Sequence, residues 1–291
     1  MIKFRNIDAT LKSLILGMAL GDIWFLNGDL GDNNSNGEDF GHAFRTLNHA
    51  ARKLVSGHHD YILCCGAETG TAELALTLPD AHIIGVGNGG VENVAYRGFQ
   101  YTCPATVDTI SLSAAADGVE IAGIHFICSA TDHILVDDAG ADNFFFHHNN
   151  VLGSGTASDA VRLDLEGSYA TIADNLFYLC KLAIDIGTAG HYDQVLRNTI
   201  QDVDVAAIGI NVAVGDYGVI ANNFLNLSGT TGDTGVKIAA GANYWIVAFN
   251  LFHSGLSDNI SDAGTGTFKV GNAEGAITGT TATSILLATE D

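Results

Sequence analysis

Proline, basic residues and charge in general are scarce in this sequence. Of its 291 residues only 2 are Pro and only 15% are charged, whereas 35 are Gly. Few charges and many glycines suit short strands joined by tight turns and are unusual for a helical bundle. A chain of this length can fold as a single domain. A solenoid of that size is possible because each repeat packs only on its neighbours.

The shortage of basic residues also argues against nucleic acids and anionic membranes as partners. Lys and Arg total 12 against 33 Asp and Glu, which gives a net charge of -21. Phosphate backbones and anionic lipids repel such a chain, so we expect neither nucleic-acid nor membrane binding.

Long apolar runs and an even set of cysteines are lacking as well. The run 14–20 is too short to span a bilayer and has no small-residue cleavage site, so we expect no export signal. The odd number of cysteines within apolar segments indicates reduced core thiols and assembly in a reducing cytosol. They are Cys64, Cys65, Cys103, Cys128 and Cys180.

A repeat of 23 to 27 residues occupies the second half of the chain. Each copy has an apolar strand, a loop and a second strand that closes on Asn and apolar residues. The Asn residues are Asn150, Asn175, Asn198, Asn223 and Asn250. Loops of variable length around a fixed strand core explain the drift in spacing, and the period of two excludes helical repeats. The pattern predicts an all-β fold, a right-handed parallel β-helix whose stacked Asn side chains form a structural ladder.

The leading strands of the five copies align at 134–136, 161–163, 184–186, 208–210 and 236–238. Because their flanking residues stay aliphatic while the middle residue varies, we expect the flanks to point inward and the middle to point outward. Outward Leu135, Gly209 and Ala239 then predict a face for a homotrimer. Three less regular coils are expected to precede these copies, around 61–64, 82–85 and 119–126.

Segments outside the repeat divide the chain further. Residues 43–55 carry Phe44, Leu47, Ala51 and Leu54 at helical spacing and predict a helix that caps the solenoid. We therefore expect an N-terminal arm at 1–20, a strand, turn and capping helix at 21–57, coils at 58–262 and an end segment at 263–291. The basic and apolar arm either docks on a partner or packs on the first coil.

The opening of the chain resembles that of pectin-lyase-like β-helix proteins of tailed bacteriophages. The resemblance lies in residues 21–26, a Gly-, Asp- and Asn-rich turn at 31–37, the segment 43–47 and the first two rungs at 60–63 and 83–87. It implies a virion protein, assembled in the host cytoplasm, on a capsid or tail and commonly trimeric. It implies no particular reaction.

One group of outward residues has catalytic potential. Asp137 and Asp164 are expected on adjacent rungs, near the carboxylate separation of retaining glycosidases, with Arg162 and Asp185 close by. Any two outward carboxylates on adjacent rungs meet that condition. The alternative is a solvated acidic face in which Arg162 and Asp185 pair across rungs.

Signals for a metal or cofactor are weaker. Residues 32–37 match the first half of a calcium loop, but Ala43 stands where a bidentate Glu is needed. The His and Cys residues show no zinc spacing, and the Gly-rich segment 87–90 opens no helix. We expect no metal and no cofactor.

Two functions remain open. The first is a non-enzymatic structural protein of a bacteriophage, a capsid-surface or stabilising protein bound to a capsid or tail protein of the same particle. The alternative is a tailspike-type depolymerase, a glycoside hydrolase or polysaccharide lyase, or a protein that binds surface polysaccharide. That function needs aromatic platforms, for which Tyr192, Tyr217, Tyr244 and Trp245 are the candidates.

Overall fold

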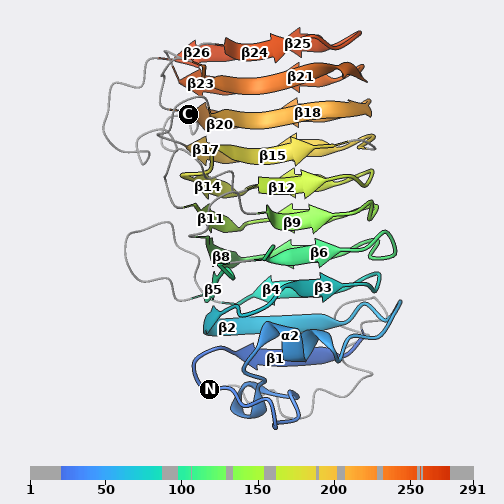
Figure 1. Cartoon of the computed structure of the whole chain (residues 1–291), viewed down its shortest axis with the longest axis vertical. Coiled ribbons are helices and arrows are strands. Elements are labelled where there is room, and N and C mark those ends of the chain that lie inside the picture. The colour runs from blue at the N-terminus through green and yellow to red at the C-terminus, as the bar shows by residue number, and fades with distance from the viewer. Residues whose placement is uncertain are drawn as a thin grey trace, which may run out of the picture.

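The computed structural model describes residues 21–86, 98–105, 107–128, 134–153, 162–187, 190–201, 207–227, 232–253, 256 and 258–275. The chain winds into a right-handed parallel β-helix, with the coils stacked along one long axis (Figure 1). Each full coil contributes one strand to each of three parallel sheets, here called sheets A, B and C. The all-β solenoid predicted from the repeat is confirmed.

The strands of each sheet follow one another along the axis. Sheet A contains β1 (Ile23–Asn27), the first half of β2 (Tyr61–Thr69), β4 (His82–Gly85), β7 (Glu120–Ala122), β10 (Phe145–His147), β13 (Thr171–Ala173), β16 (Gln194–Leu196), β19 (Val219–Ala221), β22 (Ile246–Ala248) and β25 (Phe268–Val270). Sheet B contains the second half of β2, β5 (Phe99–Thr102), β8 (Ile124–Ile127), β11 (Asn150–Leu152), β14 (Leu176–Tyr178), β17 (Thr199–Gln201), β20 (Phe224–Asn226), β23 (Leu251–His253) and β26 (Ala273–Gly275). Sheet C contains β3 (Leu74–Leu76), β6 (Ile110–Leu112), β9 (Ile134–Asp138), β12 (Arg162–Leu165), β15 (Leu182–Ile186), β18 (Ile208–Asp216), β21 (Thr234–Asn243) and β24 (Asp258–Asp262).

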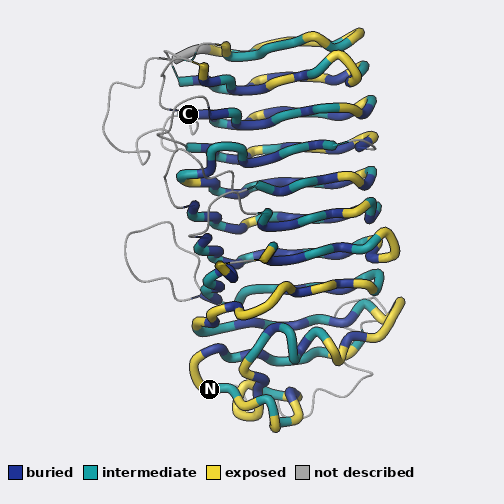
Figure 2. The backbone as a smooth tube through the Cα atoms, viewed as in Figure 1, coloured by how far each residue is buried: buried dark blue, intermediate teal, exposed yellow. Residues whose placement is uncertain are grey.

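The core is a column of apolar side chains inside the three sheets. From β1 to β23 the inward residue of each short strand is fully buried, as at Ile172, Val195 and Ile220 on neighbouring strands of sheet A. No residue of β24 or β25 in the last coil is buried. Figure 2 shows this buried interior along the axis up to the last coil, whose described residues are intermediate or exposed, and the other exposed positions lie mostly at the corners of the coils. Since every coil packs on the next, the apolar alternation found in the sequence is sufficient to specify the winding.

A ladder of buried Asn side chains lines the corner between sheets A and B. Its buried members are Asn149, Asn175, Asn198, Asn223 and Asn250, and the half-buried Asn272 extends it into the last coil. Asn150 was assigned to the ladder from the sequence, and this was wrong by one residue. Asn150 is the first residue of β11 and is only half-buried, whereas Asn149 binds the backbone of Ile121 and Ile124.

The residue before each ladder Asn adopts a left-handed backbone. Asp174 (φ 58°) and Arg197 (φ 54°) are examples, and their side chains form a two-point ion pair across neighbouring coils. This sharp bend turns the chain from sheet A into sheet B and directs the following Asn into the corner.

The strands of sheet C are offset from the expected alignment. β12 and β9 pair as Arg162 with Ile134 but as Leu163 with Val136, so Leu135 is an extra residue in its strand. Leu135 and Gly209 are both buried, and at Gly209 an added Cβ would lie 2.6 Å from Leu225 Cδ2. These two residues therefore do not form the outward apolar face that suggested a trimer, and Ala239 is only partly exposed.

The N-terminal end of the solenoid is covered, but not by the long helix expected over 43–55. The helix α2 (Leu47–Ala51) is only five residues long and follows the short 3-10 helix η1 (Phe40–His42). Phe44 instead forms a parallel bridge with Leu26 and is fully buried at the end of the core.

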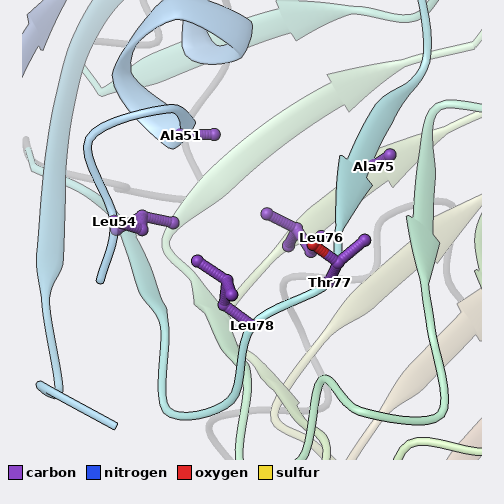
Figure 3. Close-up of a pocket in the computed structure, with 6 residues that line it drawn as sticks. All are labelled: Ala51, Leu54, Ala75, Leu76, Thr77 and Leu78. Atoms are coloured by element: carbon purple, nitrogen blue, oxygen red, sulfur yellow. The ribbon is translucent and has the colours of Figure 1, made fainter. Parts of the chain in front are cut away.

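A small cavity lies between α2 and the first strand of sheet C (Figure 3). Its volume is about 40 Å³, and it is lined by Ala51, Leu54, Ala75, Leu76, Thr77 and Leu78. This is enough for a water molecule but far below the roughly 300–1,000 Å³ of a typical ligand pocket. The cavity is a packing gap of the cap.

The coil continues beyond the expected boundary at residue 262. Thr265 bridges to Asn243, and β25 and β26 add a further rung to sheets A and B up to Gly275. The arm 1–20 and residues 276–291 lie outside the described residues. Among the helices of the described part, none is long and apolar enough to cross a membrane.

Candidate functional site

The catalytic candidates lie in one outward column on sheet C. Asp137, Asp164 and Asp185 pair in register on β9, β12 and β15, so they occupy equivalent places on three successive coils. The column continues through Asn211 and Lys237 on β18 and β21. The structure thus brings Asp185 into line with the other two carboxylates, where the sequence alignment only placed it nearby.

The contacts of this acidic column differ from the expected ones. Where a pair between Arg162 and Asp185 was expected, Arg162 Nε lies 3.2 Å from Asp164 Oδ2 on its own strand. Asp185 Oδ1 instead accepts a 2.7 Å hydrogen bond from Asn211 Nδ2 on the next coil. Each of these two carboxylates therefore has a hydrogen-bond donor beside it.

Asp137 differs from its neighbours because its environment opposes ionisation. Partial burial raises the pKa of Asp137, and the nearby carboxylates of Asp108, Asp164 and Glu166 raise it further. The raised pKa keeps the Asp137 carboxyl protonated to a higher pH, and the carboxylate of Asp164, paired with Arg162, lies one rung away. A general acid and its partner carboxylate require this combination. Adjacent strands are about 4.8 Å apart, which suits a retaining glycosidase.

A second outward feature follows the corner that leads from sheet C into sheet A. Tyr169, Tyr192, Tyr217 and Tyr244 stack with ring centroids 5.2, 5.4 and 5.1 Å apart and interplanar angles of 9° to 14°. We call this set the tyrosine ladder. Each of its side chains is about half exposed, at 46% to 52%.

The aromatic candidates named from the sequence are only partly right. Tyr192, Tyr217 and Tyr244 do stand on successive coils, but Trp245 is fully buried, and its Nε1 donates to the carbonyl of Gly215. Tyr169 was missed, although the sequence contains a signal for it. Each tyrosine of the ladder precedes a ladder Asn by six residues, as Tyr169 precedes Asn175.

A histidine and glutamate network on sheet A was also missed. Glu120 accepts a 2.7 Å hydrogen bond from His82 Nδ1 and another of 2.7 Å from His147 Nε2. These two bonds lower the pKa of Glu120 to about 2. His147 Nδ1 in turn lies 2.8 Å from His148 Nδ1. The network joins three coils, and the residue spacing gave no hint of it because the contacts cross between strands 27 to 38 residues apart.

Metal binding has no support in the described part of the chain. No group of three or more His, Cys, Asp or Glu side chains there is arranged to hold a metal ion. The calcium-like segment 32–37 forms a turn in which Asp32 Oδ1 accepts from the backbone N of Asn34, and Asn33 Oδ1 accepts from that of Thr46. These side chains serve the turn itself.

Comparison with known proteins identifies no family. No family model matches the chain, and no curated protein matches it. Among solved structures, a GH136 lacto-N-biosidase from Eubacterium ramulus is similar at 10% identity and a TM-score of 0.34, covering 88% of this chain and 68% of that one. A rhamnogalacturonan lyase is similar at 13% identity and a TM-score of 0.24, covering 88% of this chain and 63% of that one. Similarity at this level assigns no activity to the chain.

Proposed function

We propose that the chain is a non-catalytic structural protein on the surface of a bacteriophage particle, bound to a capsid or tail protein. The observation that carries the proposal is that outward side chains of successive coils bind one another. Tyr stacks on Tyr, Asp174 pairs with Arg197, and His82 and His147 share Glu120. Such cross-coil contacts stiffen a rod.

Two further features support this proposal. The arrangement of β1, a turn, α2 and β2 at the start of the chain agrees with the resemblance to tailed-phage proteins. The net charge of -21 keeps a particle surface hydrated and soluble.

The test is to locate the protein in the particle. Antibodies against the folded body, used in immuno-electron microscopy of particles purified from the phage that encodes the chain, are expected to label the capsid or tail. Mass spectrometry of the same particles is expected to recover its peptides at a fixed ratio to the major capsid protein. Recovery only from the culture fluid, with unlabelled particles, contradicts a structural role.

The acidic column favours one second candidate, a glycoside hydrolase. In that case Asp137 is the general acid and Asp164 the carboxylate opposite it, held beside Arg162. The test is release of reducing ends from a polysaccharide panel by the wild type and by the variants Asp137→Asn, Asp164→Asn and Asp185→Asn. Hydrolysis predicts activity that falls at least about 100-fold in the first two variants. An inactive wild type on every polymer removes this candidate and leaves the structural proposal untouched.

A further inference from the structure

The exposed apolar side chains of the molecule gather on one side of the solenoid. Fourteen large apolar or aromatic side chains are exposed in the described part of the chain, and eight of them lie on or beside the outer surface of sheet A in its later coils. These eight are the four residues of the tyrosine ladder together with Ile246, Phe249, Phe268 and Val270. We call this set the apolar face.

Pairing between coils makes the apolar face one continuous strip. Ile246 of β22 pairs with Phe268 of β25, and Val270 lies two residues further along β25 on the same side. Phe249 follows at the corner between sheets A and B, and its ring lies against the last coil, where a Cβ added to Gly271 would collide with it. The tyrosine ladder lines the opposite corner, two residues before the strands. The strip runs from β13 to β25, which is about 20 Å at the usual strand spacing.

The strands of this strip have no charged outward residue, and the structure describes all of these positions. The outward residues at the starts of the strands are Thr171, Gln194, Val219, Ile246 and Phe268, and those at the ends are Ala173, Leu196, Ala221, Ala248 and Val270. At the neighbouring corner, Arg197 is paired with Asp174 at 2.6 Å. In a chain with 33 Asp and Glu residues, this depletion of charge is a local feature. Few charges together with many aromatic residues are typical of the centre of a protein interface.

The last coil shows that the fold alone does not require the apolar face. In β25 the inward position, paired with Val247 of the core, is Lys269, whose Nζ binds Asp262 Oδ2 at 2.9 Å. The two outward positions are Phe268, which is 60% exposed, and Val270, which is 38% exposed. The coil thus ends the core with a charged pair and directs its apolar side chains to the outside. These side chains contribute to stability through burial only when a partner covers them.

The charge around the strip selects the kind of partner. Asp216 directly precedes Tyr217, and Asp142 accepts from the backbone N of Ser168 beside Tyr169, so carboxylates border the strip along the ladder. Together with the net charge of -21, they repel an anionic membrane and a second copy of this chain. A protein surface with an apolar centre and a rim of Lys and Arg is complementary to such a strip.

We propose that the apolar face docks on another folded protein of the same particle, at an apolar surface rimmed by Lys and Arg. This inference rests on the structural function proposed above and names the surface by which the solenoid is attached. The aromatic side chains supply most of the affinity, and the acidic surroundings steer the approach of the partner.

The test is co-sedimentation of the full chain with particles assembled without it. The purified chain is titrated onto particles of the same phage grown without the gene for the chain, the particles are pelleted, and the bound chain is measured. The wild type is expected to bind saturably, and added salt is expected to weaken the binding because the rim is charged. A wild type that does not bind overturns the structural function and the docking surface together.

Two variants test the docking surface separately from the structural function. Phe249→Asn suits the left-handed backbone, because Asn222 occupies the same corner one coil earlier, so the melting temperature should be kept. Ile246→Thr with Phe268→Thr keeps residues that favour strands and removes most of the exposed apolar surface. Each variant is expected to weaken binding to the particles at least about tenfold.

The matched control is Val55→Thr with Val107→Thr, since these valines are 45% and 41% exposed and lie outside the apolar face. It is expected to bind like the wild type. Wild-type binding by both variants of the apolar face overturns the docking surface and leaves the structural function in place. Sedimentation velocity of the pure chain covers one more outcome. A wild-type oligomer that Phe249→Asn dissociates would mean that a second copy covers the face, which overturns docking on another protein.

Discussion

Each Asn of the ladder satisfies polar backbone groups at the corner between sheets A and B. Asn198 Oδ1 accepts from the backbone N and from Nδ2 of Asn175, at 3.0 and 2.9 Å. Its Nδ2 donates to the carbonyl of Ile172 at 2.8 Å and to Asn223 Oδ1 at 3.1 Å. Because the side chain is buried, its hydrogen-bond partners cannot bond to water instead. Loss of one Asn therefore leaves several buried polar atoms without partners.

Replacement of Asn198 by Leu is therefore expected to lower the free energy of unfolding by about 1–3 kcal/mol. The matched control is Asn150→Leu, at the half-buried position next to the ladder, where the change should stay within about 0.5 kcal/mol. Urea denaturation followed by circular dichroism measures both. Equal midpoints for the two variants would mean that the ladder contributes nothing to stability.

The error of one residue at Asn150 has a physical origin. Residues 149 and 150 are both Asn, and the spacing to Asn175 is compatible with either because the loops between strands vary in length. The corner geometry decides between them, since the ladder Asn must directly follow the left-handed residue, here His148 (φ 53°). A dihedral angle of this kind is not encoded in residue spacing.

Asp193 makes stability depend on pH in an unusual direction. Burial raises the pKa of Asp193 to about 7, although its Oδ1 accepts from the backbone N of Ala170. Its Oδ2 is buried without a partner in the structure. The unfolded chain releases this proton near pH 4, while the folded chain keeps it up to about pH 7. Stability from this group is therefore full below pH 4 and is lost as the pH rises towards 7.

Asp193→Asn should keep the bond to Ala170 and remove the titration. Relative to the wild type, the variant is expected to gain stability on the order of 1–3 kcal/mol between pH 4 and pH 7.5. Glu68, whose pKa burial also raises to about 7, titrates in both proteins and cancels in the difference. Denaturation midpoints of the two proteins across this range provide the measurement, and parallel pH profiles would show that Asp193 is ionised in the folded state.

At the scale of elements, the cap depends on one aromatic residue more than on its helix. Phe44 is fully buried, lies 6.0 Å from the ring of Trp24 and 4.9 Å from that of His49, and has Lys53 Nζ 5.7 Å from its centroid. The helix α2 is tied down separately, since the backbone N of Leu47 donates to Glu68 Oε2 at 2.8 Å.

Phe44→Ala is expected to destabilise the protein by about 3–5 kcal/mol, because a large side chain leaves a cavity at the end of the core. Phe40→Ala is the control, since Phe40 is 43% exposed and should tolerate the change. Limited proteolysis, read by mass spectrometry, should show early cleavage before residue 70 in the first variant only. A wild-type cleavage pattern for Phe44→Ala would contradict the role of Phe44 as the end of the core.

The elements also show where sequence patterns stop being sufficient. Helical spacing over 43–55 predicted one long helix, but the apolar residues of that pattern adopt two different backbone conformations. Phe44 pairs with Leu26 as an extended residue, and only 47–51 are α-helical. On sheet C, two consecutive buried residues at the start of the strand, such as Leu135 and Val136, break the simple alternation and shift the outward column to Asp137.

For the whole molecule, periodicity carried most of the fold, because each coil repeats one set of contacts. The outward columns of side chains were harder to predict from the sequence. Register across coils aligns Asp137, Asp164 and Asp185, and it depends on loop lengths and on the extra residue in β9. The network around Glu120 depends on strands that pair over 27 to 38 residues, outside the well-spaced copies of the repeat. The candidate sites are defined by contacts between side chains of different coils, which the amino-acid composition does not reveal.

The arm 1–20 provides a test of how the whole molecule is attached. In the described chain the N-terminal end of the core is already covered by Phe44, Leu47 and Ala50. A protein that starts at residue 21 is therefore expected to melt at the wild-type temperature. If the arm binds a capsid or tail protein, the same truncated protein should fail to join particles when it is supplied in place of the full chain. Differential scanning calorimetry and immunoblots of purified particles measure the two properties separately. A lowered melting temperature would instead make the arm part of the cap, and normal incorporation of the truncated protein would move the attachment site to the coils.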